Sequence, residues 1–326
     1  MLPMTASPVR DAAPRARARP GAAARTAFAA VPAPGLVLLA IVSVQVGAGL
    51  AKQLFGQFTP SAVVFLRIAT GAVILAVLAR PRLRGLARRD FAVVGAFGLS
   101  LGLMNLAFYE ALARLPIGIA VTVEFLGPLG VAVASSRRRL DLLWVALAGA
   151  GIALLAPWSG GEVSLLGLLF AALAGAFWAG YIVMSATAGS RIPGTGGLTA
   201  AMIVAAVVIA PFGVTSGGAD LLEPHVILIG VGVGLLSSVI PYTLELEALR
   251  RMPKRVFGIL MSLEPAAAAL VGLIILHEFL TLWQWAAIAC VVVASVGATR
   301  TQDPPRPDGE TPPAPHGIEP EARPVP

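Results

Sequence analysis

Ten runs of predominantly apolar residues, each about 20 residues long, follow one another along this chain with short connections between them. A helix needs about 20 apolar residues to cross the hydrocarbon core of a bilayer, where it satisfies its own backbone hydrogen bonds. The sequence therefore predicts an all-α integral membrane protein with ten transmembrane helices. The predicted spans cover approximately residues 34–55, 60–79, 91–113, 116–136, 140–157, 164–187, 197–214, 225–249, 254–276 and 280–299.

The composition argues against other classes of protein. Of the 326 residues, 57% are hydrophobic and only 13% are charged, against roughly 25% charged residues in a soluble domain. The net charge of +7 comes from arginine clusters between apolar runs, without interleaved aromatic residues, so we expect no nucleic-acid partner. The single cysteine, Cys290, lies in an apolar run. It excludes an internal disulfide and a cysteine-based metal cluster.

Both ends of the chain differ in kind from the apolar runs. Residues 1–33 are rich in Ala, Pro and Arg, and residues 300–326 are rich in Pro. We expect both segments to be disordered, because neither can bury enough apolar surface to offset the entropy of an ordered chain. The first apolar run lies far from Met1 and lacks a cleavage site followed by polar sequence. It is therefore interpreted as a retained helix rather than a signal peptide.

The basic residues alternate between successive connections, which predicts the orientation of the helices. Lys and Arg are enriched in the cytoplasmic segments of membrane proteins. With a cytoplasmic N-terminus, the outer connections contain only Lys52 and Arg114 as bases and carry acids such as Glu278. We therefore predict that both termini are cytoplasmic. The inner segments then hold the arginines of the N-terminal tail, Arg80, Arg82, Arg84, Arg88, Arg89, Arg137, Arg138, Arg139, Arg191, Arg250, Arg251, Lys254 and Arg255.

A short motif occurs twice. The string EALARLP, which ends at Pro116, matches EALRRMP, which ends at Pro253. Each is followed by a glycine and, six residues after it, by a glutamate, Glu124 or Glu264. Five helices separate the two copies, and an odd number reverses their orientation in the membrane. The pattern predicts two inverted five-helix repeats with a substrate site near the midplane between them. The predicted repeats cover residues 34–157 and 164–299.

Three charged residues fall near the middle of the predicted spans, where each costs about 2.5–3.5 kcal/mol on insertion scales. Arg67, Glu124 and Glu264 all lie near the predicted midplane. In one interpretation, Arg67 pairs with one glutamate only to hold the repeats together. In the other, the unpaired glutamate carries a proton, or Arg67 and a glutamate bind the carboxylate and ammonium groups of an amino acid. We predict substrate-binding or proton-binding roles for all three residues.

Three prolines predict helix breaks. Pro128 follows Glu124 by one turn, Pro265 directly follows Glu264, and Pro241 lies inside the eighth span. Each removes a backbone donor and frees a carbonyl, which a spanning helix tolerates beside a cavity or a neighbouring helix. Simple kinking is the alternative explanation.

Other polar and aromatic residues are candidates for lining the same cavity, although each could instead bond helices together or anchor them at the interface. Two glycine pairs, Gly98 with Gly102 and Gly230 with Gly234, indicate close helix packing. Glu245 and Glu247 lie near the inner end of the eighth span, where we predict a solvent-exposed mouth of the cavity. The candidate lining residues are Gln45, Asn105, Tyr109, Trp178, Tyr181 and Tyr242.

Two stretches of this sequence resemble a known family. Residues 104–139 (MNLAFYEALARLPIGIAVTVEFLGPLGVAVASSRRR) and 240–281 (IPYTLELEALRRMPKRVFGILMSLEPAAAALVGLIILHEFLT) look like the threonine/homoserine exporter group within the EamA-type drug/metabolite transporter superfamily. The resemblance implies ten helices in two EamA repeats, and efflux of amino acids or related metabolites by proton exchange. It also implies a bacterial inner (plasma) membrane location. Arg67, Glu124, Pro128, Glu264 and Pro265 match residues typical of the group.

The leading hypothesis is thus a proton-coupled exporter of small amino acids, with an exporter of another small metabolite or drug as the alternative. A polytopic membrane enzyme is a remote alternative, because His225, His277 and His316 lack the spacing of a metal or catalytic motif. No filter motif of a channel and no ATP-binding loop is found in the sequence. The expected partners are a small-molecule substrate, protons and the lipid bilayer, with no cofactor and no metal. The oligomeric state stays open, a homodimer included.

Overall fold

The computed structural model describes residues 31–79, 87–134, 140–155, 163–192 and 196–301, and every regular element in these ranges is helical. The two predicted disordered tails lie outside these residues except for positions 31–33 and 300–301, and Arg80, Arg82, Arg84, Arg137, Arg138 and Arg139 of the predicted inner segments lie outside them too. The elements are α2 (Ala33–Gln53), η1 (Leu54–Gly56), α3 (Pro60–Ala79), α4 (Arg88–Leu112), α5 (Ile117–Glu124), α6 (Leu126–Ala134), α7 (Leu140–Leu154), α8 (Leu165–Arg191), α9 (Gly196–Gly217), η3 (Gly218–Leu222), α10 (Pro224–Gly234), η4 (Leu235–Val239), α11 (Ile240–Arg251), α12 (Lys254–Met261), α13 (Glu264–Ile275) and α14 (Leu282–Thr301).

Nine helical stretches of the described chain are long and apolar enough to cross a membrane. The fifth predicted span, α7, is helical as expected but has only 15 residues, fewer than the about 20 that a perpendicular helix needs. Large apolar side chains cover the outer surface of the helices, for example Leu142 at 70% and Leu228 at 72% exposed. Such a surface is stable against lipid rather than water, which confirms the prediction of an all-helical membrane protein.

Three of the predicted spans are interrupted rather than continuous. The fourth divides into α5 and α6 at Phe125, and the ninth divides into α12 and α13 at Ser262 and Leu263. In the eighth, the π-helical turn η4 separates α10 from α11. All three interruptions end two or three residues before Pro128, Pro241 or Pro265, as expected where a proline removes a backbone donor.

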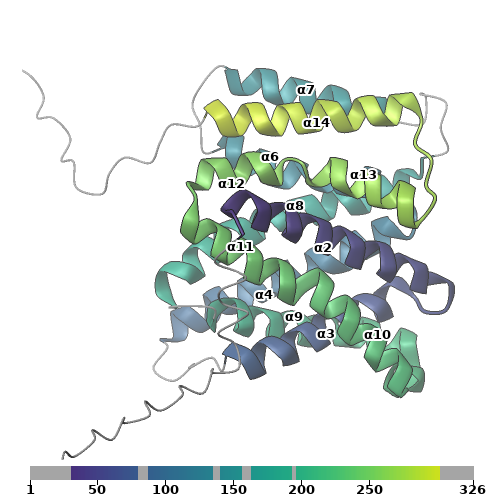
Figure 1. Ribbon diagram of the computed structural model, residues 1–326. Coiled ribbons are helices and arrows are strands. Elements are labelled where there is room, and N and C mark those ends of the chain that lie inside the picture. Colours follow the sequence, from purple (N-terminus) through teal and green to yellow (C-terminus); the bar gives the residue numbers. More distant parts are fainter. Residues whose placement is uncertain (1–30, 80–86, 135–139, 156–162, 193–195, 302–326) are drawn as a thin grey trace, which may run out of the picture.

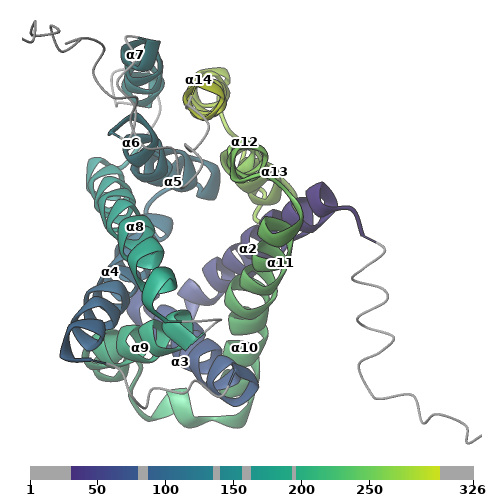
Figure 2. The ribbon, with the colours of Figure 1, turned by 90° about the vertical axis from the view of Figure 1, so that its left-hand side faces the viewer.

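The helices form two rows that are joined at both ends (Figures 1 and 2). One row contains α4, α8, α5 and α6, and the other contains α10, α11, α2, α12 and α13. Helices α3 and α9 pack together at one end of the rows, and α7 and α14 pack together at the other. Helix α5 also contacts α13 directly. Each row therefore combines helices from both halves of the chain.

Close approaches at glycines hold the rows to the α3–α9 pair. A Cβ atom at Gly98 of α4 would lie 2.6 Å from the Ala201 carbonyl oxygen of α9, and one at Gly234 of α10 would lie 3.1 Å from the Arg67 carbonyl oxygen of α3. Gly102 and Gly230 lie one turn away from these contacts, where a Cβ would come within 3.3 Å of the facing helix. The two predicted glycine pairs therefore pack helices closely, as small residues do in membranes.

An ion pair connects three segments that are far apart in sequence. The Lys52 ammonium donates to the Glu278 carboxylate and to the Leu115 carbonyl, both at 2.5 Å. The second Glu278 oxygen accepts from the Ile117 amide at 2.8 Å, one of the free donors at the N-terminus of α5. We call this set of contacts the Lys52–Glu278 clamp. It joins the end of α2, the α4–α5 turn and the connection between α13 and α14.

Candidate functional site

A buried polar cluster lies between the two rows and the α3–α9 pair. Arg67 of α3, Glu124 of α5 and Glu264 of α13 are only 5%, 7% and 8% exposed. Glu124 lies within electrostatic range of both Glu264 and Arg67. The structure thus brings together the three charged residues that the sequence places near the midplane. Charges in this position need compensating contacts, because the bilayer core supplies none.

Arg67 is bound by neutral groups. Its Nη2 donates to the Ser237 carbonyl at 2.9 Å, and its Nε donates to the Ser238 hydroxyl at 3.4 Å. Its Nη1 donates to the Tyr109 hydroxyl at 3.4 Å, and the guanidinium carbon lies 5.6 Å from the centre of the Tyr109 ring. Within the described chain, no carboxylate forms an ion pair with Arg67. The simple interhelical ion pair considered from the sequence is therefore not formed.

Glu264 begins α13 and faces α2. Its Oε1 accepts a hydrogen bond of 3.1 Å from the Gln45 amide. Its Oε2 and the Gln45 Oε1 are buried and have no hydrogen-bond partner among the described residues. Two buried acceptors without donors cost free energy. Both would accept hydrogen bonds from an ammonium group at this position, and the Glu264 carboxylate would alternatively bind a proton.

Glu124 is the last residue of α5 and lies where α6 meets α8. Pro128, four residues later, has no amide hydrogen to donate to the Glu124 carbonyl. That carbonyl instead faces Gly175 of α8, where a Cβ would lie 2.6 Å from its oxygen. The Glu124 side chain makes no hydrogen bond to the described part of the protein. Its carboxylate is therefore available to a ligand or a proton.

The remaining predicted lining residues divide into two groups. Tyr109 and Gln45 contact the charged residues directly, and the half-buried Tyr242 lies within electrostatic range of Arg67, Glu124 and Glu264. By contrast, Asn105 donates to the Leu101 carbonyl of its own helix at 2.8 Å. The other two aromatic residues pack on neighbouring rings: Trp178 meets Phe125 edge-on at 5.4 Å, and Tyr181 meets Phe97 at 5.2 Å between ring centres.

Comparisons with known proteins identify relatives of this chain. Residues 165–300 match the EamA-like transporter family. The threonine/homoserine exporter RhtA of Escherichia coli (strain K12) is 42% identical over 269 residues, which covers 82% of this chain and 90% of that protein. The protein of the same name from Salmonella typhimurium (strain LT2) is 41% identical with the same coverage. The chain belongs to the EamA-like transporter family. A solved crystal structure has the same fold at a TM-score of 0.56, with 21% identity over 81% of this chain and 96% of that one.

Membership of the EamA-like transporter family confirms the prediction of a multi-pass membrane transporter and excludes the enzyme alternative. In the described residues, no group of three or more His, Cys, Asp or Glu side chains is arranged to hold a metal ion.

Several contributors to the cluster were missed from the sequence. Ser237 and Ser238 carry the acceptors of Arg67, yet neighbouring serines in an apolar run give no specific signal. Glu245 was expected at a solvated mouth, but its side chain is half-buried and lies within electrostatic range of Glu264. Glu247 does remain at the surface, where it pairs with Arg250 and Arg251 of the same helix.

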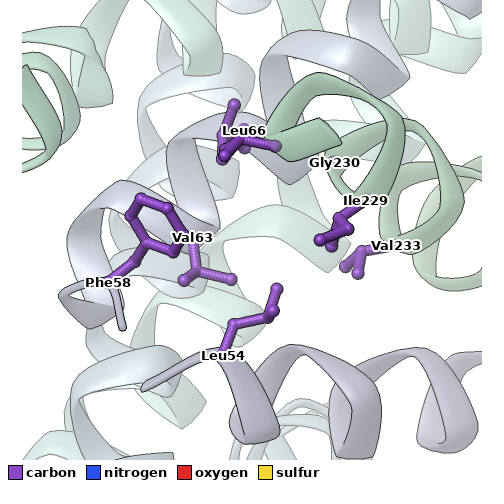
Figure 3. Close-up of a pocket in the computed structure, with 8 residues that line it drawn as sticks. Leu54, Phe58, Val63, Leu66, Ile229, Gly230 and Val233 are labelled. Carbon is purple, nitrogen blue, oxygen red and sulfur yellow. The ribbon is translucent and has the colours of Figure 1, made fainter. Parts of the chain in front are cut away.

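Two hollows in the EamA-like fold lie away from the cluster. The first lies between η1, α3 and α10 and is wholly apolar (Figure 3). Its lining residues are Leu54, Phe58, Val63, Leu66, Val226, Ile229, Gly230 and Val233. The second is open to the surface beside Glu110, between α4, α8 and α9. Neither hollow contains Arg67, Glu124 or Glu264, and the apolar one offers no polar side chain to an amino acid. The buried polar cluster is therefore the candidate site.

Proposed function

We propose that this EamA-like transporter exports small hydroxylated amino acids, threonine and homoserine first, in exchange for protons across a bacterial inner membrane. The observation that carries the proposal is the buried cluster in which one guanidinium and two carboxylates lie together without an ion pair between them. Arg67 would bind the α-carboxylate of the substrate in a bidentate manner. Glu264, beside Gln45, would accept hydrogen bonds from the α-ammonium group. The two RhtA proteins, at 41–42% identity, carry this substrate class in their names.

Glu124 and Glu264 are the proposed proton carriers. Two carboxylates and one guanidinium cannot all be neutralised by one another, and an ionised carboxylate without a partner is costly in the membrane core. Binding a proton removes that cost, and binding a substrate ammonium group does the same. Proton and substrate would therefore compete for one position, which is the requirement for obligatory exchange.

We further propose that the substrate moves by alternating access between two inverted five-helix repeats. The first spanning helix of the first half, α2, is matched to the first spanning helix of the second half, α8, and so on along the chain. With this matching, the contacts between helices support an internal two-fold relation. The packing of α4 on α8 then corresponds to that of α11 on α2, and the packing of α4 on α9 corresponds to that of α10 on α3. The α3–α9 and α7–α14 pairs correspond to themselves. With cytoplasmic termini, this relation places Glu124 and Glu264 in equivalent broken helices of opposite orientation.

Efflux from intact cells tests the proposal. Cells that lack their own threonine exporters are preloaded with radiolabelled threonine or homoserine, and efflux is compared with and without this protein. We expect faster efflux with the protein, slower efflux after the proton gradient is collapsed, and loss of efflux in the Arg67→Gln variant at equal membrane abundance. Equal efflux of both labels with and without the protein would overturn the substrate assignment and favour another metabolite. Fast efflux that is insensitive to the gradient would overturn proton exchange alone.

A further inference from the structure

The acceptors that hold Arg67 come from an irregular part of the eighth span. The turn η4 is π-helical, and the helix resumes as α11 at Ile240. In a regular α-helix, the Ser237 carbonyl would accept from the amide of the residue four positions later. That residue is Pro241, which has no amide hydrogen. The Ser237 carbonyl accepts instead from the Arg67 guanidinium at 2.9 Å.

Two further contacts bring this turn within reach of α3. Gly234, directly before η4, packs so closely that a Cβ there would lie 3.1 Å from the Arg67 carbonyl oxygen. Thr70 of α3 donates to the Gly230 carbonyl of α10 at 2.9 Å. The hydroxyl of Ser238 then completes the set, because it accepts from Arg67 Nε at 3.4 Å. These contacts hold η4 against α3 beside Arg67.

We propose that Pro241, with the turn Ser237–Ser238 in front of it, is a positioning element that holds Arg67 by neutral acceptors and so keeps its charge available to a substrate carboxylate. A carboxylate partner would hold the guanidinium equally well, but it would cancel the charge that the substrate must meet. The neutral acceptors hold the side chain and leave that charge uncancelled. The same arrangement leaves Glu124 and Glu264 without an ion pair to Arg67. This inference rests on the proposed function, because it assigns the carboxylate of the substrate to Arg67.

Two variants disturb the positioning element in different ways. Pro241→Ala supplies an amide hydrogen that competes with Arg67 for the Ser237 carbonyl, and Ser238→Ala removes the hydroxyl acceptor without altering the backbone. Pro211→Ala is the matched control for the first, because Pro211 lies inside α9 and is exposed, away from the cluster. Ser295→Ala is the control for the second, because the Ser295 hydroxyl is buried and bonds to Ser262 at 2.7 Å instead.

The decisive readout is discrimination between threonine and threonine amide, in which a neutral carboxamide replaces the carboxylate. Affinities of the purified full-length protein for both compounds are measured by calorimetry. We expect the preference for threonine to fall about tenfold in Pro241→Ala, equivalent to about 1.4 kcal/mol, and to fall less in Ser238→Ala. Both control variants should keep the wild-type preference. A purely structural defect would weaken the binding of threonine and of threonine amide equally. An unchanged preference for threonine in both test variants would overturn the proposal.

A second readout does not depend on the substrate. In protein with isotope-labelled arginine, the side-chain N–H signals of Arg67 are identified by their loss in Arg67→Lys. We expect slow hydrogen exchange of these signals in the wild type and faster exchange in Pro241→Ala. Exchange that is equally fast in both would overturn the positioning role. Slow exchange in a protein that binds neither threonine nor threonine amide would instead contradict the proposed substrate. Failure of the positioning role and failure of the proposed function are therefore distinguishable.

Discussion

Replacing Glu278 by glutamine tests how strongly the Lys52–Glu278 clamp stabilises the fold. The substitution keeps the size of the side chain but removes the charge that faces the Lys52 ammonium, and it exchanges one of two acceptor oxygens for a donor. Removing one partner of a fully buried pair costs about 3–5 kcal/mol. Here the side chains retain 19% and 16% exposure, and Lys52 keeps its bond to the Leu115 carbonyl. We therefore expect a loss of about 2–3 kcal/mol in the free energy of unfolding.

Thermal unfolding of the purified protein in detergent measures this loss. A destabilisation of this size should lower the midpoint by on the order of 5 °C in a protein of this length. Glu110→Gln is the matched control, because Glu110 pairs with Arg114, just beyond the end of α4, in a more exposed position, and exposed pairs contribute only about 0.2–1 kcal/mol. In the double variant with Lys52→Met, the loss should be smaller than the sum of the single losses. Equal midpoints for Glu278→Gln and Glu110→Gln would refute the reasoning.

Three further outcomes are expected. Gly175→Ala should lower the free energy of unfolding by about 1–3 kcal/mol, because its Cβ would lie 2.6 Å from the Glu124 carbonyl oxygen. Gly189→Ala in the same helix should not destabilise the protein, since no atom lies within 4 Å of its Cβ. Thermal unfolding of the two variants measures the difference in stability. Glu264→Gln should abolish the response of threonine efflux to the proton gradient. A retained response in preloaded cells would argue against Glu264 as a proton carrier. A cytoplasmic reporter fused after residue 300 should be active, and a periplasmic one at the same position inactive, if both termini are cytoplasmic.

Much of the fold could be predicted from the sequence, because the bilayer imposes a simple rule on it. Apolar runs of the required length had to become helices, and nine of the ten did so at spanning length. The predicted limits shift by a few residues: α4 begins at Arg88 rather than near 91, and α8 continues to Arg191 rather than 187. Polar residues at the ends of these helices extend the helical hydrogen bonding beyond the apolar run, which hydropathy alone does not detect.

The contacts within the candidate site could be predicted only in part. Hydropathy identifies Arg67, Glu124 and Glu264 as costly residues, and the duplicated motif predicts that the two glutamates lie at a similar depth. Their hydrogen-bond partners depend on which helices pack together. Gln45 and Glu264 are 219 residues apart in sequence, and Lys52 and Glu278 are 226 residues apart. No local pattern encodes such pairs. Pro241 was recognised as a break, but only the packing of α3 on α10 shows which donor uses the carbonyl that it frees.

The neutral surroundings of Arg67 have an electrical consequence. Because its charge stays fixed on α3, a zwitterionic substrate bound to it as proposed would leave the membrane without carrying net charge. In a one-for-one exchange, the inward proton would then be the only charge that crosses in a cycle. A membrane potential that is negative inside would assist each cycle by about 2.3 kcal/mol per 100 mV, equivalent to a concentration ratio of about fortyfold. The membrane potential alone would then drive export when the pH difference across the membrane vanishes.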